Sequence, residues 1–507
     1  MLTSRGYRIP KRDVPNLHHV KGVLNVKPYI PAVFVQPRFV TKYPVFTEDA
    51  EYLYVPKHYG IGEFGPITET KRDVPKTDPC FWEFAGTIRE NQKEVVNSYM
   101  CPEPRDGIIS LQTGGGKTVC ALYIASQIQM PTIVLVHNTF LRDQWVDRIK
   151  SFLPKARIGM WNEDSTLDTF IQDFVIRIDG DVIKYRNDIH TPHYKLLKNM
   201  KDEEITTLSK IMNIPATLQS ITSSIRKYTS HRDITIAMIQ GVMRESVCPD
   251  QFNDIGLLIV DECHHIASEA FSRTMSKLTS KHMLGLSATP ERKDKLMYVI
   301  NWFLGPMLYR SNTADKVDEK VRVEVYDFDP QDEEYNAIIY NNQGVMFTTL
   351  MINKVAEYKP RNDLIVNLLD DLSQEDRQIL VLTDRVEHTK TLFEGLPDKV
   401  KEHACILGSK VKATERAKFC ESKKILIATY AMCKEGFDVS TLNTLVMATS
   451  RPDVDQIVGR IMRTEKTKRA VNPLIIDIVD PAFRRQFGER LRLYKERNYQ
   501  VEKMTIE

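Results

Sequence analysis

Leu111-Gln112-Thr113-Gly114-Gly115-Gly116-Lys117-Thr118 is the stretch from which the rest of the chain can be interpreted. It follows a short apolar run, residues 107–110, and precedes a helical pattern, residues 119–129. A strand, a glycine-rich turn and a helix in this order are the context of a phosphate-binding loop, in which backbone N–H groups surround a polyphosphate. Lys117 would reach the β- and γ-phosphates, and the Thr118 hydroxyl would bind Mg²⁺. Leu111 stands where such loops usually have their first glycine, so a simple tight turn is the alternative at this point.

Length and composition favour an ordinary globular protein of several domains. The 507 residues exceed one domain, and roughly three units are expected at ~150 residues each. A hydrophobic content of 42% and a charged content of 27% are usual for globular proteins. No apolar run approaches the roughly 18 residues of a membrane span, and the first residues lack a signal-peptide core, so we expect no membrane segment.

Cysteine usage and net charge bear on whether the chain is a zinc-binding, a redox or a nucleic-acid-binding protein. The eight cysteines form no C-x-x-C pair, which argues against a zinc ribbon or a redox pair and favours reduced thiols in a cytoplasm-like compartment. The net charge of +3 is too small to indicate nucleic-acid binding by itself. The local distribution of charge therefore has to carry that argument.

Residues 1–85 are rich in proline and aromatic residues and contain short β-like runs such as residues 52–55. Before Glu48 the only acidic residue is Asp13, whereas basic residues are frequent and are interleaved with tyrosines and phenylalanines. Basic groups could neutralise phosphates, and aromatic rings could stack on bases. The equal alternative is a small accessory domain whose aromatic residues form its own core.

Three apolar runs after the phosphate loop, residues 131–136, 233–239 and 255–260, predict buried parallel strands. The first ends in His137-Asn138-Thr139, which places polar residues at the sheet edge where α/β proteins bind ligands. Residues 162–230 have charged, helical patterns without a buried-strand run. They predict a helical insertion, which is either a solvated decoration or a clamp over nucleic acid.

The run 255–260 leads directly into Asp261-Glu262-Cys263-His264. In such an acidic pair Asp261 can hold Mg²⁺ through water, and Glu262 can take a proton from the attacking water. Cys263 and the two histidines after it could suggest a metal site, but consecutive side chains diverge and no paired metal motif accompanies them. Further along, Ser287-Ala288-Thr289 offers two hydroxyls that could link the acidic pair to a neighbouring domain.

From about residue 315 a second alternation of apolar runs and helical patterns predicts another parallel-sheet unit, which has no glycine-rich loop of its own. Its strand candidates are residues 321–326, 378–383, 425–428, 445–448 and 474–478. Residues 456–463 are predicted as a helix on which Gln456, Arg460 and Arg463, spaced i, i+4 and i+7, share one face. These side chains would form a solvated surface or, opposite a γ-phosphate, arginine fingers.

In order and spacing, these motifs resemble those of superfamily 2 helicases and translocases from about residue 88 to residue 499. The segments similar to helicase motifs are residues 111–118 for motif I, 136–145 for motif Ia, 261–264 for motif II, 287–289 for motif III, 380–385 for motif IV, 429–438 for motif V and 456–463 for motif VI. The Gln-Trp pair that ends motif Ia resembles the UvsW and XPB branch. Residues 2–11 and 54–60 look like the helicases of large DNA viruses, among them the poxviral transcript-release helicases.

The resemblance implies an α/β fold with two RecA-like parallel-sheet lobes in tandem, residues 86–312 and 313–507. A small N-terminal α+β accessory domain, residues 1–85, precedes them, and the helical insertion at about 162–230 belongs to the first lobe. The implied cofactors are ATP and Mg²⁺, bound between the lobes.

The resemblance also assigns roles to individual residues. Glu262 is implied as the general base, and Lys117, Gln456, Arg460 and Arg463 as further catalytic residues. Nucleotide binding is implied for Arg89, Gln92, Thr113, Gly114, Gly115, Gly116, Lys117, Thr118, Gly436 and Asp438, and Mg²⁺ binding for Thr118 and Asp261. Coupling of hydrolysis to lobe movement is implied for His264, Ser287 and Thr289. Nucleic-acid contacts are implied for Asn138, Thr139, Thr383, Gly408, Ser409 and Thr429.

The function that this resemblance implies is that of a DNA helicase or translocase, moving 3′ to 5′, in viral transcription or in recombination and repair. Expected partners are single-stranded or branched DNA, an RNA–DNA hybrid, and the transcription or replication machinery. We expect a monomer, located in a virion or a host-cell virus factory if the chain is viral. The alternatives are the motor subunit of a restriction-like or RNA-remodelling system and a catalytically silent interaction scaffold.

Overall fold

The computed structural model describes the chain except for residues 30–39, 71–73, 75, 112–114, 162–176, 179–180, 183–232, 245–246, 267, 289–293, 312–320, 342–343, 409–412, 435–438, 440, 463–470 and 507. It divides into two compact units, Met1–Leu111 with Gly116–Arg310, and Ser311–Glu507. Of the predicted insertion, only the short strands β10 (Arg177–Ile178) and β11 (Asp181–Val182) are described. Among the described residues, no helix is long and apolar enough to cross a membrane.

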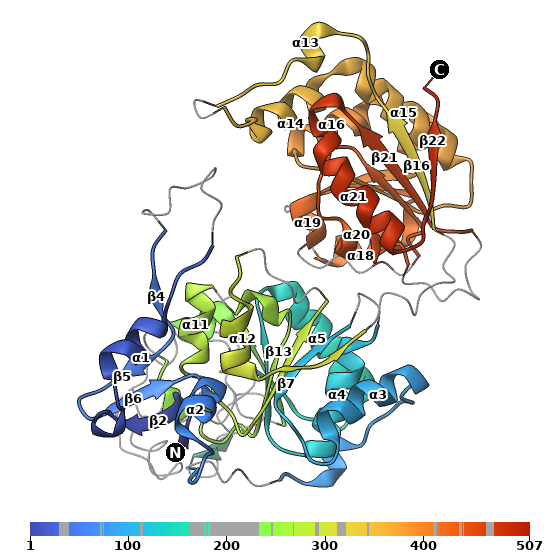
Figure 1. The fold of residues 1–507 in the computed structure, drawn as a ribbon. Helices are drawn as coiled ribbons and strands as arrows, with labels where there is room; N and C mark the ends of the chain where they lie inside the picture. Colours follow the sequence, from blue (N-terminus) through green and yellow to red (C-terminus); the bar gives the residue numbers. More distant parts are fainter. Residues whose placement is uncertain are drawn as a thin grey trace. The chain divides into compact units, whose positions relative to one another are not determined.

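The first unit is built on a seven-stranded parallel sheet with the order β15-β7-β14-β13-β8-β12-β9 (Figure 1). In chain order its strands are β7 (Gly107–Ser110), β8 (Thr132–Val136), β9 (Ile158–Trp161), β12 (Ile234–Met238), β13 (Leu257–Val260), β14 (His282–Ser287) and β15 (Met307–Arg310). The central strands are apolar on both faces because helices cover both sides of a parallel sheet. The sheet therefore separates two cores.

Helices on the two faces of this sheet fill those cores. On one face lie α3 (Glu90–Met100), α4 (Lys117–Ile128) and α5 (Thr139–Phe152), and on the other α10 (Ile239–Met243), α11 (Glu269–Met275) and α12 (Met297–Leu304). Short 3₁₀ turns, η3 (Pro79–Trp82), η4 (Pro249–Phe252) and η5 (Cys263–His265), complete the unit. Along β13, Leu257 and Ile259 pack into the first core, whereas Leu258 and Val260 pack into the second, as the two-residue period of a strand requires.

The N-terminal segment is an α+β arrangement that shares the second core. It contains β1 (Leu2–Thr3), β2 (Gly6–Pro10), η1 (Lys11–Asp13), α1 (Leu17–Val23), β3 (Asn25–Val26), β4 (Tyr43–Pro44), β5 (Thr47–Glu48), β6 (Tyr52–Val55) and α2 (Lys57–Phe64). Strands β1, β2, β6 and β5 form an antiparallel sheet. Tyr7, Leu53 and Tyr59 belong to the same buried cluster as Ile133 and Phe303 of the first sheet unit. The described residues among 1–64 are therefore packed onto the first parallel sheet.

The second unit repeats the architecture with a seven-stranded parallel sheet of order β18-β19-β17-β20-β21-β16-β22. Its strands are β16 (Arg322–Asp327), β17 (Ile379–Thr383), β18 (Ala404–Leu407), β19 (Ile425–Thr429), β20 (Thr444–Met447), β21 (Leu474–Val479) and β22 (Gln500–Met504). The fold class predicted from the sequence, two RecA-like parallel-sheet lobes in tandem, is confirmed. Each predicted strand of this unit corresponds to an interior strand of the sheet.

Helices cover both faces of the second sheet as well (Figure 1). In chain order they are α13 (Glu333–Asn336), α14 (Thr348–Glu357), α15 (Lys359–Ser373), α16 (Val386–Gly395), α17 (Asp398–Lys401), α18 (Ala413–Ser422), α19 (Tyr430–Lys434), α20 (Asp455–Val458), η8 (Pro481–Phe483) and α21 (Arg484–Glu496). Side chains of α14, α15 and α16 pack in one core, and those of α19, α20 and α21 in the other.

Candidate nucleotide site and nucleic-acid contacts

The glycine-rich loop connects β7, an interior strand, to the N-terminus of α4, as the sequence predicted. Gly116 precedes the helix with a left-handed backbone (φ 86°). The backbone therefore favours glycine, and a Cβ atom here would lie 2.2 Å from Gln92 Nε2, so the amide end of Gln92 would have to move to admit it. Thr113 and Gly114, which were predicted to contact phosphates, lie outside the described residues.

Gln92 lies against this loop instead of on an exposed helix face. Its side chain is buried, and its Oε1 accepts a hydrogen bond from the Arg89 backbone N–H at 3.1 Å. The structure therefore brings the two residues predicted to contact adenine together at the start of α3, beside Gly116.

The acidic pair follows β13, two strands away from β7 in the sheet. Asp261 is buried, and both of its carboxylate oxygens accept hydrogen bonds: Oδ2 from Trp145 Nε1 at 2.8 Å and Oδ1 from the Glu262 backbone N–H at 3.0 Å. Parallel strands present their carboxyl ends at one edge of the sheet. The phosphate loop and the acidic pair consequently share that edge.

Glu262 has a left-handed backbone (φ 47°, ψ 52°), a conformation that costs a non-glycine residue of order 1–3 kcal/mol. Its Oε1 lies 3.3 Å from Lys117 Nζ, and its Oε2 lies 3.3 Å from His264 Nδ1. His264 Nδ1 is also 3.1 Å from Ser287 Oγ, at the end of β14. Lys117, Glu262, His264 and Ser287, far apart in the sequence, thus form one continuous polar cluster.

Burial and charge act differently on the two carboxyl groups. Burial, reinforced by the neighbouring Glu262 charge, raises the pKa of Asp261 despite the opposing Lys117 ammonium. Burial alone would also raise the pKa of Glu262, but Lys117 and His264 together lower it below its usual value. Glu262 is therefore ionised at neutral pH, which is the state that a general base needs.

The cluster suits Mg²⁺ and a nucleotide in its donor chemistry. Glu262 Oε2 is buried, and apart from His264 Nδ1 at 3.3 Å no described residue satisfies it. A buried carboxylate with a raised pKa, as at Asp261, is stabilised in its charged form by a nearby cation, and Mg²⁺ prefers carboxylate, hydroxyl and water oxygens. Asp261 and Thr118 are the residues that would hold the ion.

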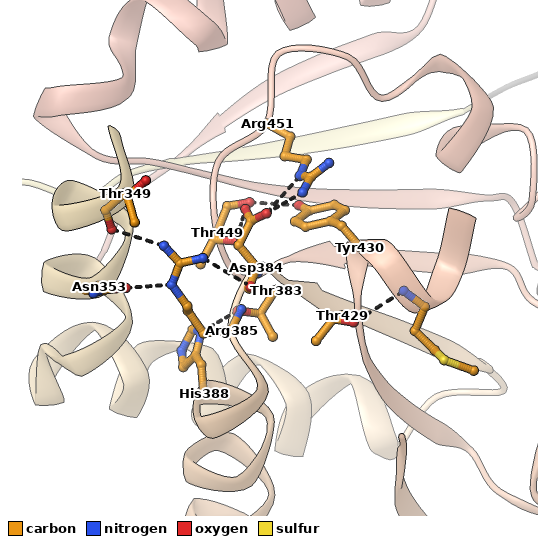
Figure 2. A network of polar contacts seen from close by, with 11 residues as sticks. Thr349, Asn353, Thr383, Asp384, Arg385, His388, Thr429, Tyr430, Thr449 and Arg451 are labelled. Carbon is orange, nitrogen blue, oxygen red and sulfur yellow. Dashed lines mark hydrogen bonds and ion pairs between the residues drawn. The ribbon is translucent and has the colours of Figure 1, made fainter. Parts of the chain in front are cut away.

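In the second unit, the predicted contact residue Thr383 ends β17 inside a polar network (Figure 2). The Thr383 side chain is fully buried, its Oγ1 lies 2.8 Å from His388 Nδ1, and it also accepts the Arg385 backbone N–H at 3.3 Å. The Thr383 hydroxyl is therefore hydrogen-bonded to residues of the second unit itself. Asp384, next in the chain, accepts a hydrogen bond from Arg451 Nε at 3.0 Å and another from the Thr449 hydroxyl at 3.0 Å.

Arg385 extends the network to α14, where its Nε donates to Asn353 Oδ1 at 2.5 Å and its Nη2 to the Thr349 carbonyl oxygen at 3.0 Å (Figure 2). Asp384 and Arg451 were not predicted as functional residues. Asp384 lies within residues 380–385, the segment that resembles motif IV, but it was not singled out there. Its partner Arg451 is 67 residues away, so the sequence does not reveal the pair.

The other predicted nucleic-acid contacts have mixed surroundings. Asn138 caps the N-terminus of α5, and its Oδ1 accepts the Leu141 backbone N–H at 2.8 Å, whereas Thr139 is exposed. Thr429 Oγ1 accepts the Met432 backbone N–H at 3.3 Å at the start of α19. Gly408 has open space where a Cβ would stand. Ser409 lies outside the described residues, and all of these contacts stay predictions.

The predicted helix over residues 456–463 is wrong in its extent. Helix α20 ends at Val458, and the chain continues through i to i−3 bonds, Arg460 N to Ile457 O at 3.0 Å and Ile461 N to Val458 O at 3.2 Å. Gly459 follows the helix, and glycine is unfavourable in helix interiors. The argument that Gln456 and Arg460 share a helical face therefore does not hold, because Arg460 lies beyond the helix.

Several residues with predicted roles in the site are not described. The side chain of Gln456 and the whole of Arg463, Thr289, Gly436 and Asp438 lie outside the described part of the chain.

Comparisons with known proteins agree with this architecture. The family model described as "Type III restriction enzyme, res subunit" matches residues 85–292. The chain is 26% identical over 518 aligned positions to the "Putative ATP-dependent RNA helicase L396" of Acanthamoeba polyphaga mimivirus, an alignment that covers 100% of this chain and 87% of the relative. It is 25% identical over 446 positions to the "Putative helicase 161L" of Invertebrate iridescent virus 6, covering 82% of each.

Among solved structures, the ATP-dependent Type ISP restriction-modification enzyme LlaBIII bound to DNA has a similar fold, with a TM-score of 0.51 and 13% identity, over 83% of this chain and 31% of that one. The family model over the first sheet, together with a similarity to viral helicases that runs through both sheets, supports a superfamily 2 helicase of viral type.

Proposed function

We propose that the chain is a DNA-dependent ATPase of the helicase or translocase kind, using ATP with Mg²⁺ to unwind or remodel DNA in viral transcription, such as transcript release, or in recombination and repair. The observation that carries the enzymatic part is the cluster of Lys117, Glu262, His264 and Ser287 at one sheet edge. An inactive scaffold would not need an ionised carboxylate held between the phosphate-loop lysine and His264.

In this proposal each residue has one task. Lys117 neutralises phosphate charge, and Glu262 accepts the proton of the attacking water through its buried Oε2. Mg²⁺, when bound, neutralises charge that develops on the phosphate oxygens. His264 and Ser287 link the base to β14. A movement of the acidic pair is therefore transmitted to residues 287–289, the segment that resembles motif III. Gln92 and Arg89 select the base of the nucleotide.

DNA as the nucleic acid rests on the pattern of motifs resembling the UvsW and XPB branch and on the similarity to a DNA-bound restriction enzyme. Relatives named as RNA helicases favour RNA as the second candidate. A 3′-to-5′ direction, the monomeric state, the transcription or replication partners and a reducing compartment or virus factory belong to the proposal. So do the division at residues 85 and 312 and the roles of Arg460 and Arg463 in turnover.

The deciding experiment is ATPase activity of the full chain measured side by side with single-stranded DNA, duplex DNA, branched DNA and RNA. We expect stimulation by DNA, strongest with single-stranded or branched forms. Stimulation by RNA alone would transfer the proposal to the RNA-remodelling class, and no ATPase activity with any of them would contradict it.

Glu262→Gln is the matched active-site variant, because it preserves size and removes only the charge. We expect unchanged nucleotide affinity, measured with a fluorescent ATP analogue, and turnover lower by about 10²–10⁴-fold, the usual contribution of a general base. Unchanged turnover would show that Glu262 is not the base.

A further inference from the structure

Trp145 is a fully buried tryptophan whose indole N–H points at a carboxylate. It belongs to α5, 116 residues before Asp261 in the sequence, and its Nε1 donates to Asp261 Oδ2 at 2.8 Å. Indole has one donor and no acceptor, so this bond uses the whole polar capacity of the ring. A hydrogen bond to an ionised acceptor is also roughly twice as strong as one between neutral groups.

The bond has a geometric consequence for Asp261. An ionised carboxylate has about four lone-pair sites, and the described contacts use one on each oxygen, through Trp145 Nε1 and the Glu262 backbone N–H. Two bonds from two directions hold the plane of the carboxylate, and a lone pair on each oxygen is left for water or a cation. Without the indole, only the backbone N–H of the adjoining residue would orient the group.

We propose that Trp145 is a positioning residue that holds the Asp261 carboxylate in the orientation required for a divalent cation. This inference rests on the proposed function, since it assumes that Asp261 binds Mg²⁺. The simpler alternative is that the carboxylate only satisfies a buried indole N–H. The two differ in one observable, because only a positioning role makes the Mg²⁺ dependence of nucleotide binding sensitive to the indole nitrogen.

Trp145→Phe removes the N–H and retains an aromatic ring, and Trp82→Phe is its matched control. Trp82 is also buried and donates its indole N–H, at 2.6 Å, but to the neutral Thr77 hydroxyl. The measurement is the affinity of the full chain for a fluorescent ATP analogue, in EDTA and over a titration with Mg²⁺. We expect Trp145→Phe to need about tenfold more Mg²⁺, the lower end of the usual effect of residues that orient metal ligands. Its affinity in EDTA, and both properties of Trp82→Phe, should equal those of the natural chain.

Asp261→Asn tests whether Trp145 acts through Asp261. In that background, Trp145→Phe should have no further effect on the Mg²⁺ requirement, because the two residues belong to one interaction. Additive effects would overturn the inference. So would equal Mg²⁺ requirements of Trp145→Phe and Trp82→Phe while the natural chain shows Mg²⁺-dependent nucleotide binding. Absence of Mg²⁺-dependent binding in the natural chain would instead contradict the proposed function itself.

A second measurement leaves Trp145 in place and covers the case that Trp145→Phe does not fold. The chain has four tryptophans, so a sample labelled with ¹⁵N-tryptophan gives four indole N–H resonances. We expect one resonance to shift both on addition of Mg²⁺ with the ATP analogue and on the substitution Asp261→Asn. If no indole resonance responds to either change, the inference is wrong.

Discussion

Lys57 offers the sharpest test of how the N-terminal segment is joined to the first parallel sheet. Its ammonium group is bonded to Asp106 Oδ2 at 2.5 Å and to the carbonyl oxygens of Lys281 at 2.7 Å and Ser280 at 3.3 Å. The side chains of Lys57 and Asp106 are each only 7% exposed. Asp106 Oδ1 in turn accepts the Met283 backbone N–H at 2.9 Å. Lys57→Met preserves the length of the side chain and removes its charge.

The expected loss follows from leaving one buried charge alone. Removing one partner of a buried ion pair costs about 3–5 kcal/mol of the free energy of unfolding. At roughly 2–4 °C per kcal/mol for a unit of this size, the midpoint of thermal unfolding should fall by about 6–20 °C at pH 7. Asp106→Asn in the same chain should recover much of this loss, because it removes the uncompensated charge.

The pH dependence of that loss has a definite sign. Burial would raise the pKa of Asp106, but Lys57 and His58 outweigh it and lower the pKa below 3.8, so the stabilisation is present above pH 3.8 and is lost as the pH falls further. In Lys57→Met, burial dominates and the folded-state pKa of Asp106 rises. The difference in stability between the two proteins should therefore be largest near neutral pH and should shrink on acidification.

Tryptophan fluorescence is the appropriate assay because Trp82, Trp145, Trp161 and Trp302, the four tryptophans of the chain, all belong to the first unit. Thermal unfolding followed by this signal reports that unit in the full chain. Lys93→Met is the control, since the Lys93–Glu90 pair is exposed and its loss should not move the transition measurably. A shift below about 2 °C for Lys57→Met at pH 7 corresponds to less than 1 kcal/mol on the same scale. Such a result would refute the argument that the N-terminal segment and the first sheet unfold together as one cooperative unit.

Three further predictions concern the site and the second unit. Gly116→Ala should weaken binding of a fluorescent ATP analogue, because it adds a Cβ 2.2 Å from Gln92 Nε2 and a residue at φ +86°, which costs about 1–2 kcal/mol. Burial lowers the pKa of His388 from 6.5 to about 3, so its contribution to stability is present above pH 6.5 and is lost toward pH 3. His388→Asn should flatten the acid limb of hydrogen-exchange protection in second-unit peptides. Arg490→Met leaves the buried Asp477 unpaired, and urea unfolding followed by circular dichroism should show a loss of about 3–5 kcal/mol.

Most of the strands that the sequence missed differ from the predicted strands in their place in the two parallel sheets. Interior strands such as β8, β13 and β17 are apolar on both faces, so continuous runs of Val, Ile and Leu revealed them. Five strands of the two parallel sheets were not predicted: β9, β15, β18 and β22, which are the edge strands, and β14, which is interior. Edge strands are often short, and β22 is mostly exposed, with the sequence QVEKM. Its place depends on pairing with β16, which local sequence does not encode.

The members of the candidate site could be predicted for the same reason, whereas their arrangement could not. Parallel strands bring their carboxyl ends to one edge, so the phosphate loop and Asp261-Glu262 had to be neighbours once the sheet was recognised. The left-handed backbone of Glu262 and the hydrogen bond from Trp145 depend on tertiary structure, which the local sequence does not encode. Nothing in a Gln-Trp pair shows which buried carboxylate, 116 residues away, will receive the indole N–H.

The segment before Arg460 is not a continuous helix, so contacts with other parts of the second unit hold it in place. Arg490, on α21, donates to Ser450 Oγ at 2.8 Å and to the Arg451 carbonyl oxygen at 2.9 Å, and Arg497 Nη2 lies 2.9 Å from both carboxylate oxygens of Asp455. These bonds fix residues 450–455 from outside, and the single turn of α20 then leads to Arg460. One helical turn orders little by itself. The bonds from Arg490 and Arg497, together with the burial of Ile457, Val458 and Ile461 in the core, therefore hold the segment that leads to Arg460 in place of a continuous helix.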